Sequence, residues 1–253
     1  MENSEQYLHS KMKLREEVSS AIREPIGNVE YKHNGDVCVE NEKLKAKFKY
    51  GFADYCNFVR GPDEIEGLLG NTDPSNDWRI LEQFSIIDKQ TNMEVDILTE
   101  LPEGYRILFN PFLEAYNGSA NVIEKGCLVK GDIASIAGIL IILHEIGHCV
   151  DYERTDDKSE WRNARAWIED SSNYEKLKLV LLKERNAWAY ALNKVRPFLR
   201  SGAFPKEEIS KNIHGRSLFS YCDMIQEKMN EILAAETKEF EEFEAKLHEL
   251  VGM

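Results

Sequence analysis

The chain has 253 residues, of which 42% are hydrophobic and 30% are charged, so its length suits one large or two small domains. This composition excludes disorder of the whole chain, because enough apolar side chains are present to form a core. The 45 acidic and 32 basic residues give a net charge of -13, which repels phosphate backbones and argues against non-specific binding of nucleic acids.

The N-terminal part predicts a helix, a hairpin and a long loop. Residues 1–24 are polar and highly charged with good helix propensity, which indicates a surface helix that ends before Pro25. Apolar and polar residues alternate over 36–52, the period of a half-buried β-hairpin. Gly, Pro, Asn and Asp collect over 61–77, so we expect a loop that separates an N-terminal module, residues 1–60, from the rest.

The next segments predict strands less clearly. Residues 78–87 and 95–98 fit either strands or a short helix, whereas residues 105–109 fit a strand. The tripeptide Asn117-Gly118-Ser119 is a turn signal, and the apolar residues of 121–129 indicate another strand after it.

A buried helix is predicted after Gly131. Asp132 can accept hydrogen bonds from the free amides of a first turn, so we expect the helix to begin at Ile133. Its apolar run to Leu143 is too short to cross a bilayer. The run leads into His144-Glu145-Ile146-Gly147-His148, which places two imidazoles on one side of the helix, where both can reach a single ion.

A second long helix is expected between the capping box Ser172-Asn173-Tyr174-Glu175 and Pro197. Glu184 falls in the middle of its apolar stripe, which consists of Leu177, Val180, Leu181, Ala187, Trp188, Ala191 and Val195. A buried, unpaired carboxylate costs several kcal/mol, so an ion or a basic group should neutralise Glu184. An ordinary salt bridge with Arg185 or Arg196 would also satisfy it.

The remaining sequence completes the domain organisation. Residues 205–253 are rich in Glu and Lys and predict helices that pack on a core at 78–200. Neither a stretch of about 20 apolar residues nor a secretion signal is found. The five cysteines form no Cys-x-x-Cys pair, which suggests reduced thiols. We therefore expect a cytoplasmic protein that binds neither membranes nor nucleic acids.

The spacing of the two histidines points to zinc. A catalytic zinc usually has three protein ligands and keeps one position for a water, whose pKa falls toward about 7. Glu145 stands beside the first histidine and can take a proton from that water, while Gly147 lets another element approach. Glu184 is the candidate for the third ligand, with Asp151, Asp170 and Glu175 as competitors.

These motifs together resemble a known family. His144-Glu145-Ile146-Gly147-His148 with the downstream Glu184 is similar to the zinc-dependent metallopeptidases of the gluzincin type, and Glu184-Arg185-Asn186-Ala187 resembles the Glu-x-x-Ala element of small gluzincin-like domains. The resemblance covers residues 105–197. The metzincin pattern is absent, because Asp151-Tyr152-Glu153 stands where a Gly and a third His would be required.

The resemblance implies a zincin-like α+β fold, in which a small, mostly antiparallel sheet packs on the histidine-bearing helix and on a Glu-bearing helix. It implies three zinc ligands and a general base, namely His144, His148 and Glu184 as the ligands and Glu145 as the base. The segment 115–123 is similar to the edge strand with which such enzymes hold an extended peptide. This similarity suggests Val122 and Ile123 as substrate-binding residues.

Two functions are compatible with these patterns. The first is a cytoplasmic zinc metallopeptidase, a hydrolase and more specifically an endopeptidase, that cleaves a peptide or protein substrate with a metal-activated water. The alternative is a catalytically silent, zinc-containing binding or regulatory module. Glu145 favours the enzyme, because a structural zinc needs no carboxylate beside its first histidine and closes its fourth position with protein.

Overall fold

The structure is a computed structural model, and it describes residues 22–32, 34–52, 78–113, 117–163, 174–213, 225–231, 233–234, 237–238 and 241–242. The strands are β1 (Gly35–Glu40), β2 (Leu44–Phe52), β3 (Arg79–Asp88), β4 (Glu94–Asp96), β5 (Arg106–Asn110), β6 (Asn117–Asn121) and β7 (Gly126–Lys130). The helices are α4 (Ile136–Arg154), α5 (Lys158–Asn163), α7 (Tyr174–Lys194), α8 (Arg196–Ser201) and α9 (Lys206–Asn212).

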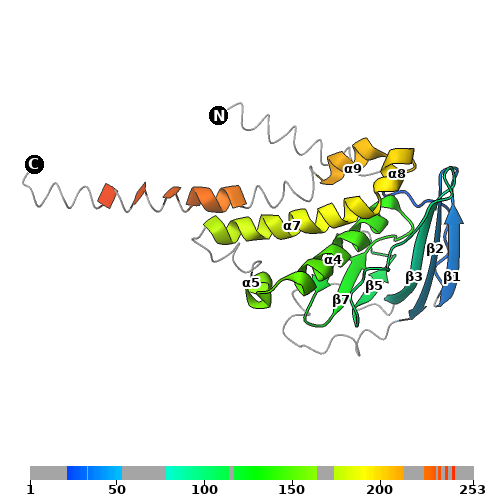
Figure 1. Cartoon of the computed structure of the whole chain (residues 1–253), viewed down its shortest axis with the longest axis horizontal. Coiled ribbons are helices and arrows are strands. Elements are labelled where there is room, and N and C mark those ends of the chain that lie inside the picture. Colours follow the sequence, from blue (N-terminus) through cyan, green and yellow to red (C-terminus); the bar gives the residue numbers. More distant parts are fainter. Residues whose placement is uncertain are drawn as a thin grey trace, which may run out of the picture.

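The fold is mixed α/β, with helix α4 packed on one open sheet and helix α7 packed on α4 (Figure 1). The strand order is β1-β2-β3-β5-β7-β6, with β4 paired to β3. Neighbouring strands are antiparallel except for β5 and β7, which are parallel. The predicted hairpin is confirmed as β1 and β2, and β2 also pairs with β3, so the hairpin belongs to the same sheet as the later strands. The mostly antiparallel sheet is therefore confirmed.

Of the ambiguous segments, residues 79–87 lie in strand β3 and residues 95–96 lie in strand β4, whereas residues 97–98 form a bend. The predicted turn at Asn117-Gly118-Ser119 is wrong, because these residues lie in β6 and pair with β7 over the register Asn117↔Lys130 to Asn121↔Gly126. The turn lies instead at 122–125, where Lys125 has a φ of 52°. Pairing with the buried strand β7 outweighs the turn preference of Asn and Gly.

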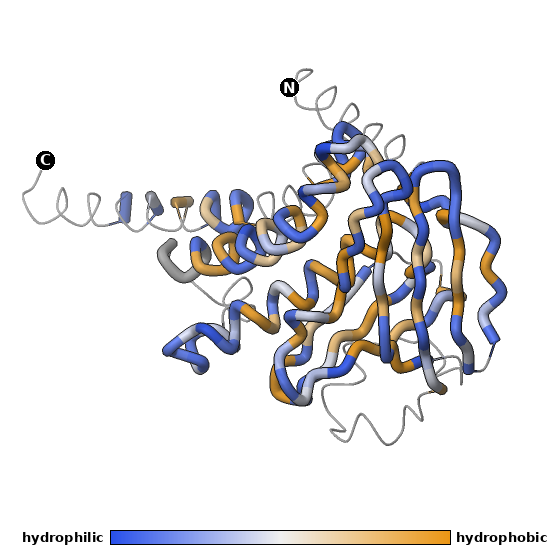
Figure 2. Tube along the Cα trace, turned by 45° about the vertical axis from the view of Figure 1, so that its right-hand side comes forward, coloured by the Kyte–Doolittle hydropathy of each residue, from blue (hydrophilic) through white to orange (hydrophobic). Residues whose placement is uncertain are grey.

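The core lies between the sheet and α4, where hydrophobic residues concentrate (Figure 2). Side chains alternate between the faces of the central strands. Ile107 and Phe109 belong to the main core, whereas Leu108 of the same strand packs with Trp78 and Leu128 in a smaller cluster. The main cluster includes residues of α4, so this helix is fixed on one face of the sheet.

Helix α4 is buried on nearly all sides, since 14 of its 19 residues are buried. It begins at Ile136 with Ser135 as N-cap, so the predicted start at Ile133 with Asp132 as the cap is wrong. The side chain of Asp132 accepts a hydrogen bond from the amide of Ala134, within the turn before the helix. The carbonyl of Ile22 accepts from the amide of Ala137, so a distant segment satisfies a free amide of the first turn.

Pro197 does not end the second long helix. Helix α7 ends at Lys194, and Pro197 lies in the first turn of α8, where its missing N–H costs no hydrogen bond. Helix α9 and the helical residues among 225–242 agree with the helical C-terminal region. No helix among the described residues is both long and apolar enough to cross a membrane.

Several predicted features fall outside the described residues. These are residues 1–21 of the N-terminal helix, the loop at 61–77, Ser172 of the capping box and much of the predicted helical region at 205–253. Residues 22–24, which the prediction placed at the end of the first helix, form turns and a bend instead. The division into parts 1–60, 78–200 and 205–253 stays a prediction.

Candidate metal centre

The two long helices bring three ligand-type side chains together. His144 and His148 lie one turn apart on α4, and Glu184 faces them from the middle of α7. The two Nε2 atoms are 3.1 Å apart, and carboxylate oxygens of Glu184 lie 3.3 Å from Nε2 of His144 and 3.5 Å from Nε2 of His148. All three residues are buried, with exposed fractions of 8 to 9%. The structure thus assembles the donor set that the sequence singled out.

The spacing of these donor atoms fits a tetrahedral metal. Ligands bound to zinc at about 2.0 to 2.1 Å in a tetrahedron lie about 3.3 Å from one another. The two Nε2 atoms are 3.1 Å apart, Oε2 of Glu184 lies 3.3 Å from Nε2 of His144, and its other oxygen, Oε1, lies 3.5 Å from Nε2 of His148, so each of these separations is close to that value. One ligand atom from each of the three residues lies within 4.8 Å of the others, so the group is compact enough to hold a metal ion such as zinc.

The electrostatics of the cluster also suit a cation. Burial and the neighbouring His144 lower the pKa of His148 from 6.5 to about 3, so this imidazole is neutral at neutral pH. Its contact with Glu184 is then not an ion pair, and neutral imidazole is the form that binds metals. A divalent cation between the donors would give the buried carboxylate an opposite charge.

Gly147 permits the close approach of α7 to α4. A Cβ atom at Gly147 would lie 2.8 Å from both the Cα and the carbonyl oxygen of Ala187, a fully buried residue of α7. Both are backbone atoms, so they could move only with the helix. The prediction that Gly147 lets another element approach is confirmed, and that element carries Glu184.

Asp151 ties α4 to α5 and α7. Its carboxylate accepts a hydrogen bond from Nε1 of Trp161 at 2.8 Å and another from Nδ2 of Asn186 at 3.0 Å. Asn186 lies two positions after Glu184, so these bonds help to hold the ligand-bearing part of α7. Asp151 was a competing candidate for the third ligand, and in the structure both of its carboxylate oxygens accept hydrogen bonds from these two residues. Asp170 and the side chain of Glu175 lie outside the described part of the chain.

Two tryptophans border the imidazoles. The ring of Trp188 lies 4.3 Å from that of His144, and the ring of Trp161 lies 6.2 Å from that of His148. Nζ of Lys183 lies 3.4 Å from the centre of the Trp161 ring. These contacts restrict the orientation of both imidazoles. Sequence reasoning did not identify Trp161 and Asn186 as residues of the site. Their only signal was an aromatic and an amide side chain close in sequence to the predicted metal ligands.

Glu145 lies between α4 and the edge strand β6. It is 5% exposed, and a Cβ atom at Gly118 would come within 2.5 Å of its Oε1 and 2.7 Å of its Cγ. The missing side chain at Gly118 therefore makes room for the Glu145 carboxylate. Sequence reasoning placed Gly118 in a turn and missed this contact, although a glycine within a strand often marks a close approach.

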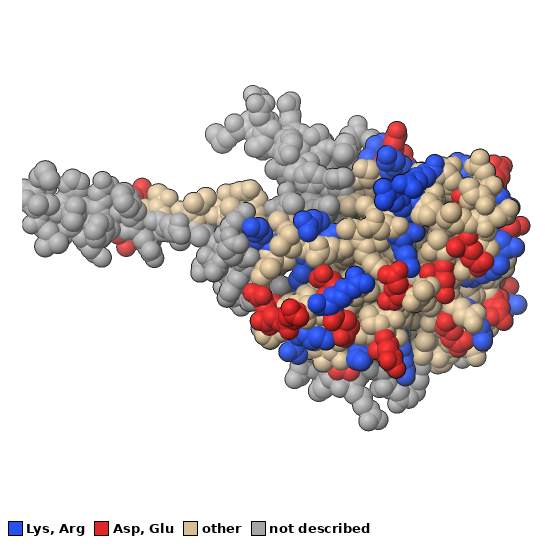
Figure 3. All heavy atoms as spheres, viewed as in Figure 1, with Lys and Arg blue, Asp and Glu red and all other residues tan. Residues whose placement is uncertain are grey.

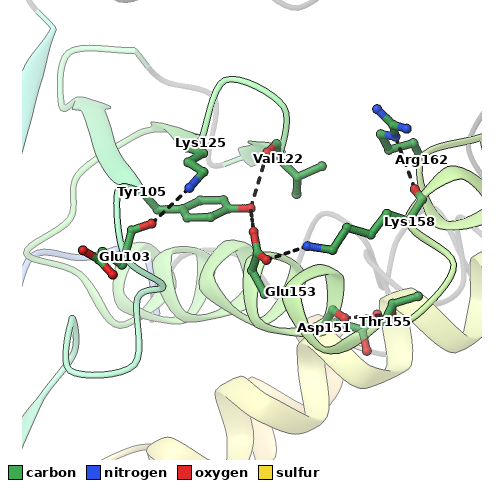
Figure 4. A network of polar contacts seen from close by, with 9 residues as sticks. All are labelled: Glu103, Tyr105, Val122, Lys125, Asp151, Glu153, Thr155, Lys158 and Arg162. Carbon is green, nitrogen blue, oxygen red and sulfur yellow. Dashed lines mark hydrogen bonds and ion pairs between the residues drawn. The ribbon is translucent and has the colours of Figure 1, made fainter.

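Val122 and Ile123 do not lie on the edge strand, so their predicted placement is wrong. Both belong to the turn between β6 and β7, where Val122 is buried and Ile123 is 55% exposed. The hydroxyl of Tyr105 lies 3.4 Å from the Val122 carbonyl and 2.9 Å from Oε1 of Glu153, whose other oxygen binds Lys158 (Figure 4). The turn is thus tied to the end of α4, and the backbone of β6 itself forms the sheet edge.

The charged residues do not form a field of one sign over the face shown in Figure 3. Lys and Arg gather near α8, whereas Asp and Glu gather near α5 (Figure 3). Charges of both signs reduce long-range steering of a ligand. The net charge of -13 therefore does not indicate the charge of a substrate that would bind at this face.

Comparison of the chain with protein-family models, curated proteins and solved structures finds no match.

Proposed function

We propose that the protein is a zinc-dependent metallopeptidase of the gluzincin type, a hydrolase acting on a peptide or protein substrate. The observation that carries this proposal is the buried triangle of His144, His148 and Glu184, with Glu145 next to the first histidine on α4. The open sheet on α4 and the crossing of α4 with α7 support a zincin-like architecture.

The residues of the site would divide the chemistry between them. A bound zinc would supply a Lewis acid and a water whose pKa falls toward about 7. Glu145 would accept a proton from the attacking water and deliver it to the leaving amine, so no covalent intermediate is needed. The low exposure of the site residues keeps bulk water away from this proton transfer.

Strand β6 is the part of the sheet best placed to hold an extended substrate. It is the last strand of the sheet order beside β7, and its Gly118 borders Glu145. A peptide could add to the outer edge of β6 through main-chain hydrogen bonds, with its scissile bond near Glu145. The free thiols of Cys38, Cys127 and Cys149 suit the reducing cytoplasm, where we place this activity.

The proposal is tested by metal analysis combined with digestion of a peptide library. We expect about one zinc per chain, cleavage of library peptides, loss of cleavage with a chelator and its return when zinc is added back. Mass spectrometry of the new termini identifies the cleaved bonds. A chain that holds zinc and cleaves no peptide would contradict the proposal.

The alternative function, a zinc-containing binding or regulatory module, has one observation in its favour. His144, Glu145, His148 and Glu184 are each less than a tenth exposed, as in a site closed to solvent. A module of this kind would bind zinc and a partner protein without turnover. The library digestion separates the two functions, because only the enzyme generates new peptide termini.

The Glu184→Gln substitution should abolish tight zinc binding. The amide has nearly the same shape as the carboxylate but carries no charge. Loss of a residue that only supports a ligand lowers metal affinity by roughly 10- to 100-fold, so loss of the ligand itself should lower zinc affinity by more than that. Calorimetric zinc titration measures this effect.

The exposed Glu160→Gln on α5 is the matched control for this substitution, and it should bind zinc like the original chain. If Glu184→Gln bound zinc as tightly as this control, Glu184 would not be a ligand.

The Gly118→Ala substitution should slow hydrolysis while zinc remains bound. The added Cβ would overlap the Glu145 side chain, which must turn away from its present position. A displacement of about 1 Å at a reacting group can cost about 100-fold in rate. The measurements are kcat/KM on a cleaved library peptide and the zinc content.

Ser119→Ala provides the control, because neighbouring side chains on a strand point to opposite faces. Equal rates for the two β6 variants would show that Glu145 does not depend on the room at Gly118.

A further inference from the structure

Two buried thiols face each other between the sheet and α4. Cys127 lies on β7, Cys149 directly follows His148 on α4, and their sulfur atoms are 3.4 Å apart. Both residues are fully buried. The proposed hydrolysis uses neither thiol.

We propose that Cys127 and Cys149 form a redox site that closes to a disulfide and thereby joins β7 to α4. The sulfur atoms need to approach from 3.4 Å to the disulfide length of about 2.05 Å. The sheet register holds Cys127 opposite Ile107 of β5 and Ala120 of β6, so its position is set by both neighbouring strands. Among the three described cysteines, Cys127 and Cys149 are therefore preorganised for each other, whereas Cys38 is exposed.

A small peroxide such as hydrogen peroxide supplies the oxidising equivalents. One sulfur attacks a peroxide oxygen, the O–O bond breaks, and a sulfenic acid and one water form. The second sulfur then attacks the sulfenic sulfur, the S–S bond forms, the S–O bond breaks, and a second water carries away the oxygen and the remaining proton. The two sulfurs together lose two electrons, which reduce the peroxide.

Burial should make this reaction slow but selective. The contact with Cys149 and burial raise the pKa of Cys127, which lowers its thiolate fraction. Cys38 is exposed and should react with external reagents first. Oxidation of the buried pair then requires a local opening of the core that admits the peroxide.

The disulfide also has a consequence for the metal centre, and this consequence rests on the proposed function. Cys149 is adjacent to His148, so closing the sulfur pair draws that turn of α4 toward β7. We expect zinc affinity to fall by about tenfold or more, because loss of the contacts that orient a metal ligand typically has an effect of this size. Zinc titration of the oxidised and reduced chain measures this effect separately from formation of the disulfide.

The test treats the folded, full-length chain with hydrogen peroxide, blocks the remaining thiols and identifies linked tryptic peptides by mass spectrometry. The expected product joins peptide 126–130 to peptide 131–154 with the loss of two hydrogen atoms, and dithiothreitol reverses it. Cys127→Ala and Cys149→Ala should each abolish this product, whereas Cys38→Ala should retain it. The oxidised chain should have a Tm higher by about 5 °C or more, because the cross-link restricts the unfolded chain.

The proposal is overturned if both buried thiols stay free while Cys38 is oxidised. It is also overturned if the linked peptides join other cysteines, or if the 126–130 product arises only in urea. None of these outcomes depends on zinc binding or peptide cleavage, so this test can fail while the proposed function stands.

Discussion

Glu145→Gln should reduce peptide hydrolysis by about 100- to 10,000-fold, the range that general acid–base catalysis contributes. The amide cannot accept the proton of the attacking water, although it fills nearly the same space beside Gly118. The zinc ligands are untouched, so the zinc content and the zinc affinity should stay close to those of the original chain. Steady-state kinetics on a cleaved library peptide and metal analysis provide the two measurements.

Glu160→Gln on α5 controls for the loss of one negative charge, because Glu160 is exposed and lies on another helix. The expected pattern is full activity in this control and full zinc with almost no activity in Glu145→Gln. Unchanged kcat/KM in Glu145→Gln would remove Glu145 from the mechanism. Loss of zinc in that variant would instead show that Glu145 is needed to maintain the metal site.

Gly147→Ala should destabilise the protein and weaken zinc binding, although the same change usually stabilises a helix by roughly 1 kcal/mol. The added Cβ would meet two backbone atoms of Ala187 at 2.8 Å, so α7 must move away from α4. Overpacking of this kind costs about 1 to 3 kcal/mol. Because Glu184 moves with α7, zinc affinity should fall by about tenfold or more.

Ala189→Val is the control for Gly147→Ala, because Ala189 is an exposed residue of α7 close to Ala187. Its free energy of unfolding should change by only a few tenths of a kcal/mol, the difference in helix propensity. Urea unfolding and zinc titration of both variants test the comparison. A Gly147→Ala chain that is more stable than the original would show that the two helices do not meet closely at this position.

The donor set was predictable because its signals are local. The four-residue spacing of His144 and His148 brings both onto one face of any α-helix. Glu184 was recognisable because a carboxylate in an apolar stripe requires a neutralising partner. The β1–β2 hairpin was predictable for a similar reason, since the alternation of its residues reports a half-buried sheet.

The features that sequence reasoning missed depend on contacts between distant segments. Strand β6 looks like a turn until its pairing with β7 is known, and Gly118 has a task only because β6 passes beside Glu145. Helix α4 begins three residues later than predicted, where the segment at Ile22 supplies a hydrogen bond to its first turn. The bond between Asp151 and Asn186 spans 35 positions, which no local pattern reports.

The central claim is tested most directly by anomalous diffraction at the zinc absorption edge from crystals of the zinc-loaded chain. The account predicts one strong peak at about 2.0 to 2.2 Å from Nε2 of His144, Nε2 of His148 and a carboxylate oxygen of Glu184. A solvent molecule should occupy the remaining position. A peak elsewhere, a Glu184 carboxylate turned away from the histidines, or a fourth protein donor in the solvent position would contradict the account.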